Sequence, residues 1–218
     1  MINVYQIKSE EPKTPFAPVY NYYICTADIS TLIDFNDIRN VILKKEKEII
    51  KKYDTGLNDA YTELGHNSLT SRFEHYNIFD WPEMFNLKSA VKSIHDMFID
   101  YLKLQTKPVY INGWANVMRK GEQIKPHIHG TSEETYLGGH ICVQCNNTST
   151  HYINPVNQIN NPEIYSSKNE VGKITLFENC LPHYTDIHKG NSERITIAFD
   201  LNPFIPEKIK NNKFVRLY

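Results

Sequence analysis

The sequence predicts a mainly β fold, a sandwich or small barrel, with helices laid against one face. Loops containing Gly, Pro and Asn separate four segments rich in β-branched and aromatic residues: VYINGWANVM (109–118), YLGGHICVQC (136–145), GKITLFEN (172–179) and RITIAFDL (194–201). The first half of the chain shows helical periodicity instead. Helices followed by a run of short strands are typical of packed sheets or a barrel with helices on one side.

The first half is predicted to hold one strand and two helices. VYNYYICTA (19–27) has the composition of a strand. DIRNVILKKEKEIIKKYD (37–54) places Ile and Val on one side and charges on the other, as in a helix with one solvated face. NLKSAVKSIHDMFIDYLKL (86–104) repeats apolar residues every three or four positions, which predicts a helix packed on a sheet.

The stretch between these helices, residues 53–83, is polar, punctuated by glycine and without a sustained period. Long irregular segments often carry function, so we expect it to form part of a lid or of a substrate wall. The alternative is that its aromatic residues are simply packed.

Length and composition favour one soluble domain. The 218 residues are 40% hydrophobic and 22% charged, which allows one substantial core. We expect a single domain over 1–218, with helical support over 1–105 and a β core over about 106–203. No apolar run reaches the roughly 20 residues of a membrane span, and the opening MINVYQIKSEEP lacks the apolar stretch of a signal peptide. A cytoplasmic location is therefore expected.

The overall charge argues against two classes of partner. A net charge of −1 and a pI near 6.8 give no general attraction to nucleic acid or to an anionic membrane. Neither is expected as a partner. The four cysteines are expected to be reduced in the cytoplasm, and we interpret Cys142 and Cys145 as small core residues rather than as a redox or zinc pair.

A pair of histidines provides the first functional signal. IKPHIHGTS (124–132) places His127 and His129 two residues apart, so on a strand both rings would point to the same face. Imidazole is a common metal ligand, but a tight site needs a third one. His183 follows the apolar strand GKITLFENCLP and is the favoured candidate, with His140 as its competitor.

The strand ERITIAFD provides the second signal. Alternation places Arg194, Thr196 and Ala198 on one face of it. An arginine pointing into a barrel needs an anionic partner, because an unpaired buried guanidinium is very costly. That partner is either the carboxylate of a small ligand, which suits the two-pronged guanidinium, or an Asp or Glu of the protein.

Taken together, PHIHG, GGHICVQ, GKITLFENCLPHYTD and GNSERITIAFD resemble the 2-oxoglutarate- and Fe(II)-dependent oxygenases. INGWANVMRKGEQIKPHIH and the upstream TGL and NSLTSRFEHYNIF are similar to the phage-type branch related to prolyl-4-hydroxylases. The resemblance covers about residues 53–203 and is most specific in the C-terminal half. It implies a double-stranded β-helix, or cupin-like jelly roll, with Fe(II), 2-oxoglutarate and O2 as cofactors and ascorbate as a reductant.

The resemblance also implies roles for individual residues. His127 and His183 would be metal ligands, Arg194 would hold the distal carboxylate of 2-oxoglutarate, and Thr196 would assist it. The chain departs from the family at His129, where a carboxylate is usual. We expect His129 to bind the metal, with Glu133 or Glu134 as the alternative.

Two residues of the strand before the histidines are candidates for supporting roles. Asn116 is expected to contact the co-substrate or a metal ligand, and Trp114 to pack in the core.

The function predicted from the resemblance is hydroxylation of a peptidyl or other C–H substrate, in the manner of prolyl hydroxylases. A protein, a peptide or a small molecule could be that substrate, and the location would be the host cytoplasm if a phage encodes the chain. One alternative is a cupin-like three-histidine metalloenzyme that does not use 2-oxoglutarate, and another is a noncatalytic jelly-roll binding module. No feature of the sequence indicates an oligomeric state.

Overall fold

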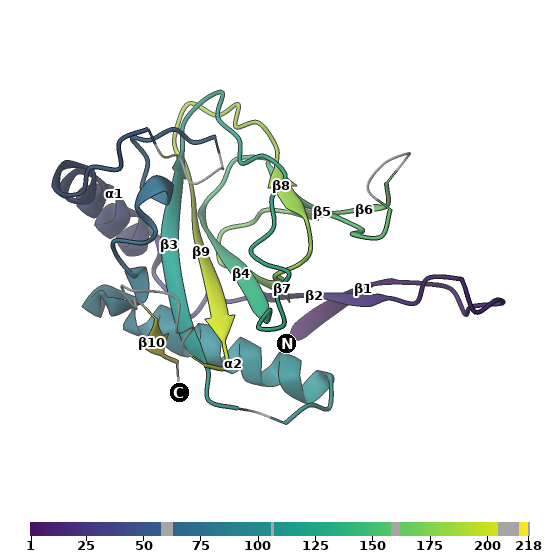
Figure 1. Ribbon diagram of the computed structural model, residues 1–218. Coiled ribbons are helices and arrows are strands. Elements are labelled where there is room, and N and C mark those ends of the chain that lie inside the picture. Colours follow the sequence, from purple (N-terminus) through teal and green to yellow (C-terminus); the bar gives the residue numbers. More distant parts are fainter. Residues whose placement is uncertain (58–62, 106, 158–161, 205–213, 218) are drawn as a thin grey trace.

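The computed structural model describes residues 1–57, 63–105, 107–157, 162–204 and 214–217 (Figure 1). Within them, two antiparallel sheets form the β core. The larger sheet has the order β1 (Ile2–Lys8), β2 (Asn21–Asp28), β7 (Lys173–Glu178), β4 (Leu137–Gln144), β9 (Arg194–Asn202), β3 (Tyr110–Met118) and β10 (Val215–Arg216). The smaller sheet has the order β6 (Ile164–Lys168), β5 (Ser149–Ile153) and β8 (His183–Thr185).

The smaller sheet is extended by a loop rather than by a fourth strand. Residues 124–130 lie beside β8 and join it through an isolated antiparallel bridge between His127 and His183. With this loop counted, four strands of the larger sheet (β7, β4, β9 and β3) face four segments of the smaller one (β6, β5, β8 and the loop). This is the arrangement of a double-stranded β-helix. The predicted fold class is confirmed.

Two helices pack against the outer face of the larger sheet; in Figure 1, α1 lies to the left of β3 and α2 lies below the strands. They are α1 (Phe35–Lys52) and α2 (Phe85–Tyr101). The carboxylate of Asp34 caps α1 by accepting hydrogen bonds from the first backbone N–H groups, so the helix begins two residues before the predicted Asp37. Buried apolar residues of both helices form one core with the outward side chains of the sheet: Ile38, Ile42, Leu87, Val91, Phe98, Ile195, Ile197, Phe199 and Leu201.

The predicted strands are present as β2, β3, β4, β7 and β9. The sequence did not predict β1, β5, β6, β8 or β10, which are short or lie at the edges of the sheets. Because β1 and β2 belong to residues 1–105, the larger sheet is not confined to 106–203. No helix in the described ranges combines the length and the apolar character needed to cross a lipid bilayer.

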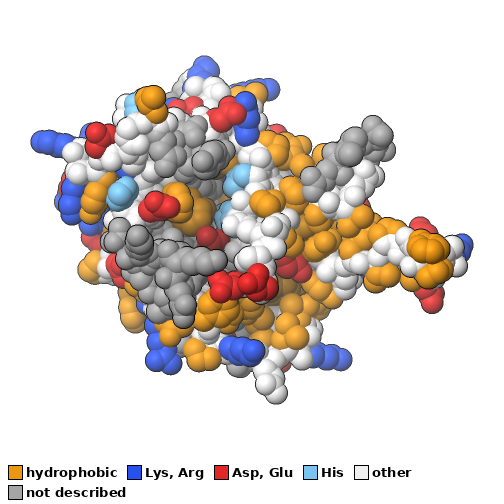
Figure 2. Space-filling model, viewed as in Figure 1, with side chains coloured by type: hydrophobic (Ala, Val, Ile, Leu, Met, Phe, Trp, Pro, Cys, Tyr) orange, Lys and Arg blue, Asp and Glu red, His pale blue; other side chains and the backbone are white. Residues whose placement is uncertain are grey.

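The β1–β2 arm extends away from the body, and Figure 2 shows hydrophobic side chains along it. Tyr5 of β1 stacks on Tyr165 of β6 with ring centroids 4.0 Å apart, which attaches the arm to the smaller sheet. Phe16 and Val19, farther along the arm, are exposed.

The irregular segment after α1 is held by a buried arginine. It contains three short 3-10 helices, η1 (Thr70–Arg72), η2 (Ile78–Asp80) and η3 (Pro82–Met84). The guanidinium of Arg72 donates to the carbonyl oxygens of Tyr53 at 2.8 Å, Ser68 at 3.0 Å and His66. These neutral acceptors saturate the buried cation, so Arg72 serves the structure.

We predict that Gly139→Ala destabilises the fold by about 1–3 kcal/mol, the usual cost of overpacking a core. A Cβ atom at this position would lie 2.4 Å from Cζ of Phe199 and 2.7 Å from the backbone oxygen of Thr175. Urea denaturation measures the free energy of unfolding. Gly130→Ala is the matched control, because its Cβ would meet only Oγ1 of Thr135 at 3.7 Å. Equal stability of the two variants would contradict this account of the packing.

Candidate active site

The loop 124–130 is fixed by backbone hydrogen bonds to the segment that leads into β8. His127 and His183 exchange bonds of 3.1 and 3.0 Å, and the N–H of His129 donates to the carbonyl oxygen of Asn179 at 2.9 Å. The expectation of a regular strand at His127 and His129 is therefore wrong. Isolated backbone bonds position the two rings instead, and one further bond runs from the N–H of Thr185 to the carbonyl oxygen of Ile124 at 3.0 Å.

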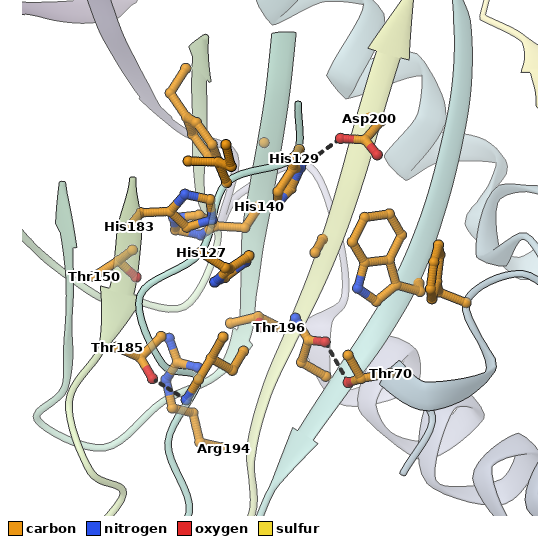
Figure 3. Close-up of a pocket in the computed structure, with 18 residues that line it drawn as sticks. Thr70, His127, His129, His140, Thr150, His183, Thr185, Arg194, Thr196 and Asp200 are labelled. Carbon is orange, nitrogen blue, oxygen red and sulfur yellow. Dashed lines mark hydrogen bonds and ion pairs between the residues drawn. The ribbon is translucent and has the colours of Figure 1, made fainter. Parts of the chain in front are cut away.

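Three imidazoles converge in the space between the two sheets (Figure 3). The metal-ligand atoms that His127, His129 and His183 offer all lie within 4.8 Å of one another, and this is the one such group among the described residues. His140, the predicted competitor, is not part of it.

Each of the three rings has its Nδ1 held by an oxygen that can only accept. Nδ1 of His127 lies 2.8 Å from the carbonyl oxygen of Lys125, and Nδ1 of His183 lies 2.9 Å from that of Leu181. Nδ1 of His129 lies 2.6 Å from Oδ1 of Asp200 on β9. Nδ1 must therefore carry the proton in every ring, which leaves the Nε2 lone pair free for a metal.

The surroundings also keep the imidazoles of His127 and His183 neutral. Burial, followed by the neighbouring imidazoles, lowers the pKa of His127 to about 4 and lowers the pKa of His183 well below its usual value. A neutral imidazole is the form that binds a metal, so protons do not compete strongly at neutral pH.

A glycine of β4 makes room for the third ring. A Cβ atom on Gly138 would lie 2.4 Å from Oδ1 of Asn179 and 3.1 Å from Nδ1 of His129. Any side chain at this position would push the loop away from the sheet. The absence of a side chain at 138 therefore sets how closely His129 approaches β9.

Arg194, at the start of β9, lies deep in the same cavity and is 1% exposed. Its side-chain contacts are neutral: Nε donates to Oγ1 of Thr148 at 3.1 Å, and Nη1 lies 3.1 Å from Sδ of Met118. No carboxylate in the described part of the chain forms an ion pair with it. Unlike Arg72, this guanidinium is not saturated by the protein, and burial lowers its pKa.

Thr196 and Asn116 lie between the arginine and the histidines. They are register partners on β9 and β3, both are buried, and both line the cavity. Oδ1 of Asn116 accepts a hydrogen bond of 2.6 Å from the hydroxyl of Thr70, which fixes the orientation of the amide. Its Nδ2–H2 group is then the part that can donate to a bound molecule.

An aromatic wall borders the histidines on the side of β3. Trp114 lies with its ring centroid 5.5 Å from that of Phe73 and 5.8 Å from that of His129. Trp114 packs against the hydrophobic core, as predicted, but it is only partly buried and also lines the cavity of about 200 Å³. Thr70 and Phe73 come from the irregular segment 53–83, whose described part does form a wall of the cavity.

The remaining candidates are not members of the histidine cluster, although His140 lines the same cavity. Glu133 and Glu134 are exposed and belong to no group of candidate ligands. Nε2 of His140 contacts the hydroxyl of Tyr152 at 2.8 Å, and burial, followed by the charge of Arg194, lowers the pKa of His140 to about 3. Cys142 and Cys145 are both free thiols; Cys142 is buried, as expected for a core residue, whereas Cys145 is only partly buried, so the prediction of a core position is wrong for Cys145.

The sequence reasoning missed Asp200. Alternation along β9 carries the cavity-facing series from Arg194 through Thr196 and Ala198 to Asp200, and all four line the cavity. The signal was thus available in the sequence two residues beyond the point where the reasoning stopped.

Comparison with known proteins gives a family match and similar folds. Residues 112–200 match the family described as "Putative 2OG-Fe(II) oxygenase", which implies Fe(II), 2-oxoglutarate and O2. No curated protein matches the sequence. The match and the fold confirm the predicted resemblance to the superfamily, whereas its phage-type branch stays a prediction.

Three solved structures illustrate the similarity. AviO1 from Streptomyces viridochromogenes superposes with a TM-score of 0.54 at 14% identity, over 81% of this chain and 89% of that one. A prolyl hydroxylase from Trichoplax adhaerens, in complex with a peptide fragment of hypoxia inducible factor, gives 0.53 at 12% identity over 83% of each chain. The epimerase SnoN from nogalamycin biosynthesis, in complex with Fe3+ and alpha ketoglutarate, gives 0.50 at 8% identity over 81% and 78%. At these identities the similarity is one of fold.

We predict that His127→Ala and His183→Ala each weaken the binding of a divalent metal by more than about 100-fold, beyond the range typical for loss of an outer partner. Titration with Co(II), followed by its visible absorption, measures the affinity. His151→Ala is the control, because both nitrogens of that ring already contact Ser166 and Asp186 outside the cluster. Unchanged affinity in either cluster variant would remove the proposed site.

Proposed function

Because residues 112–200 match the family of 2-oxoglutarate- and Fe(II)-dependent oxygenases, we propose that this chain is a hydroxylase of that class. The observation that carries the proposal is the buried Arg194, which lacks a carboxylate partner among the described residues and shares one cavity with the histidine cluster. A metal ligand set beside an unsatisfied cation suits a small dicarboxylate that bridges the two.

The proposed ligand set consists of His127, His129 and His183. The orientation of each ring by its Nδ1 contact supports this role, because the three Nε2 atoms need no reorganisation to bind an ion. Imidazole ligands suit ferrous iron, and a facial set of three leaves positions open for co-substrate and oxygen. When bound, Fe(II) would couple the oxidative decarboxylation of 2-oxoglutarate to hydroxylation of a C–H bond.

The remaining residues have positioning roles in this proposal. Arg194 would bind the distal carboxylate with its planar fork, and Thr196 would add a hydroxyl on the same strand face. The amide of Asn116, held by Thr70, would donate to the co-substrate. Phe73 and Trp114 would exclude water from the reacting centre and guide the substrate C–H bond toward it.

The substrate class is proposed more coarsely, as a peptide, a protein side chain or a small molecule. The similar Trichoplax protein is a prolyl hydroxylase in complex with a peptide, whereas SnoN is an epimerase, so one fold serves several reactions. A three-histidine enzyme that does not use 2-oxoglutarate is less well supported, because Arg194 has no ion-pair partner in the described protein. Activity in the cytoplasm, in a host cell if the chain is phage-encoded, is part of the proposal.

We predict that the purified protein forms succinate from 2-oxoglutarate in the presence of Fe(II), ascorbate and oxygen, even without added substrate. Succinate is quantified by chromatography, and a chelator should abolish its formation. Protein that binds iron but forms no succinate, alone or with a panel of proline-containing peptides, would favour the three-histidine alternative.

We predict that Arg194→Met raises the half-saturating 2-oxoglutarate concentration by about 10- to 150-fold, which corresponds to the 1.5–3 kcal/mol of hydrogen bonds to a charged group. Co(II) affinity should be unchanged, because Arg194 lies outside the ligand cluster. Arg194→Lys is the matched variant, because it keeps the positive charge but lacks the planar guanidinium. Its half-saturating 2-oxoglutarate concentration should lie between those of the wild type and Arg194→Met. Normal dependence on 2-oxoglutarate in Arg194→Met would reassign the arginine.

A further inference from the structure

A carboxylate lies one hydrogen bond outside the histidine cluster. We infer that Asp200 is a positioning residue that supplies, through His129, the negative charge that the three-histidine ligand set lacks. This inference rests on the proposed metal site. It follows from the contact of 2.6 Å between Nδ1 of His129 and Oδ1 of Asp200, with the two side chains 7% and 23% exposed.

The other two histidines provide an internal comparison. Nδ1 of His127 and Nδ1 of His183 donate to neutral backbone carbonyl oxygens, whereas Nδ1 of His129 donates to a carboxylate. A charge-assisted hydrogen bond is shorter and stronger than a neutral one, and it raises the basicity of the opposite ring nitrogen. His129 is therefore the strongest donor of the three toward a cation.

The charge count explains why this pair matters. Three neutral imidazoles leave a divalent ion with its full charge, whereas two imidazoles and one carboxylate reduce that charge by one. His129 together with Asp200 restores the same total while keeping the anion out of direct contact with the metal. The carboxylate is thus retained, but it acts on the metal site through the ring of His129 instead of binding the ion directly.

The scaffold around Asp200 is rigid. Asp200 lies in β9 between β3 and β4, with Asn112 and Gly138 as its register partners. Gly138 lacks the side chain that would separate the loop from the sheet, so His129 reaches the carboxylate directly. A central strand that is hydrogen-bonded on both sides holds a charged group more firmly than a loop does.

The first test is Asp200→Asn, which keeps the size of the side chain and a hydrogen-bond acceptor but removes the charge. Co(II) affinity, measured by titration and visible absorption, is expected to fall by about 10- to 100-fold. Asp186→Asn is the matched control: Asp186 contacts Nε2 of His151 at 2.9 Å in a histidine–aspartate pair outside the cluster, so its Co(II) affinity should match that of the wild type. Circular dichroism and thermal melting establish that the variants are folded.

The second test repeats Asp200→Asn in a His129→Asp background, where the carboxylate is moved into the ligand position. Here Asp200 has no imidazole to act through and repels the new carboxylate, so its neutralisation should leave Co(II) affinity unchanged or improve it. A loss of Co(II) affinity in the wild-type background that is absent or reversed in the His129→Asp background supports the inference. An equal loss in both backgrounds, or no loss in either, overturns it.

The two proposals fail in different ways. Wild-type protein that binds no Co(II) would overturn the metal site and this inference together. Wild-type protein that binds Co(II) no more tightly than Asp200→Asn would overturn the role of Asp200 alone. Tight binding without succinate would overturn the proposed reaction, while the comparison of the two backgrounds would still decide the role of Asp200.

Discussion

The two-residue alternation along β9 is the constraint on which the rest of the structure depends. One set of side chains, including Ile195, Ile197 and Phe199, packs into the core beneath the helices. The other set, from Arg194 to Asp200, lines the cavity. A slip of one residue in the register of this strand would bury the charged side chains among apolar ones and expose the apolar side chains to the cavity. The hydrophobic burial that stabilises the fold therefore also places the polar groups of the site.

Two buried arginines show that burial alone does not decide whether the protein compensates a buried charge. Arg72 and Arg194 are both almost fully buried, yet the first is surrounded by backbone carbonyls and the second by a hydroxyl and a thioether. Carbonyl dipoles compensate a guanidinium well, whereas a hydroxyl and a sulfur atom do so only in part. The free energy that the fold leaves uncompensated at Arg194 is available to a bound anion.

Periodicity identified the central strands, both helices and the cavity-facing positions of β9, because burial on one face forces a regular pattern on the sequence. It did not identify β8 or β10, which have three and two residues and are too short to show a period, and it also missed β1, a seven-residue strand at the edge of the larger sheet. The histidine pair was found for a reason that proved incorrect: the two rings converge because the loop is bonded to β8, not because they share a strand. The contact between His129 and Asp200 joins residues 71 positions apart, and no local pattern encodes it.

Gly138 has a consequence for how this protein tolerates variation. It offers no side chain to any ligand, yet the space that it leaves empty is the space into which Asn179 and His129 fit. A substitution there would spare the ion-binding atoms and still displace one of them. In a mutational scan, position 138 would therefore be as intolerant as the histidines themselves, for a purely steric reason.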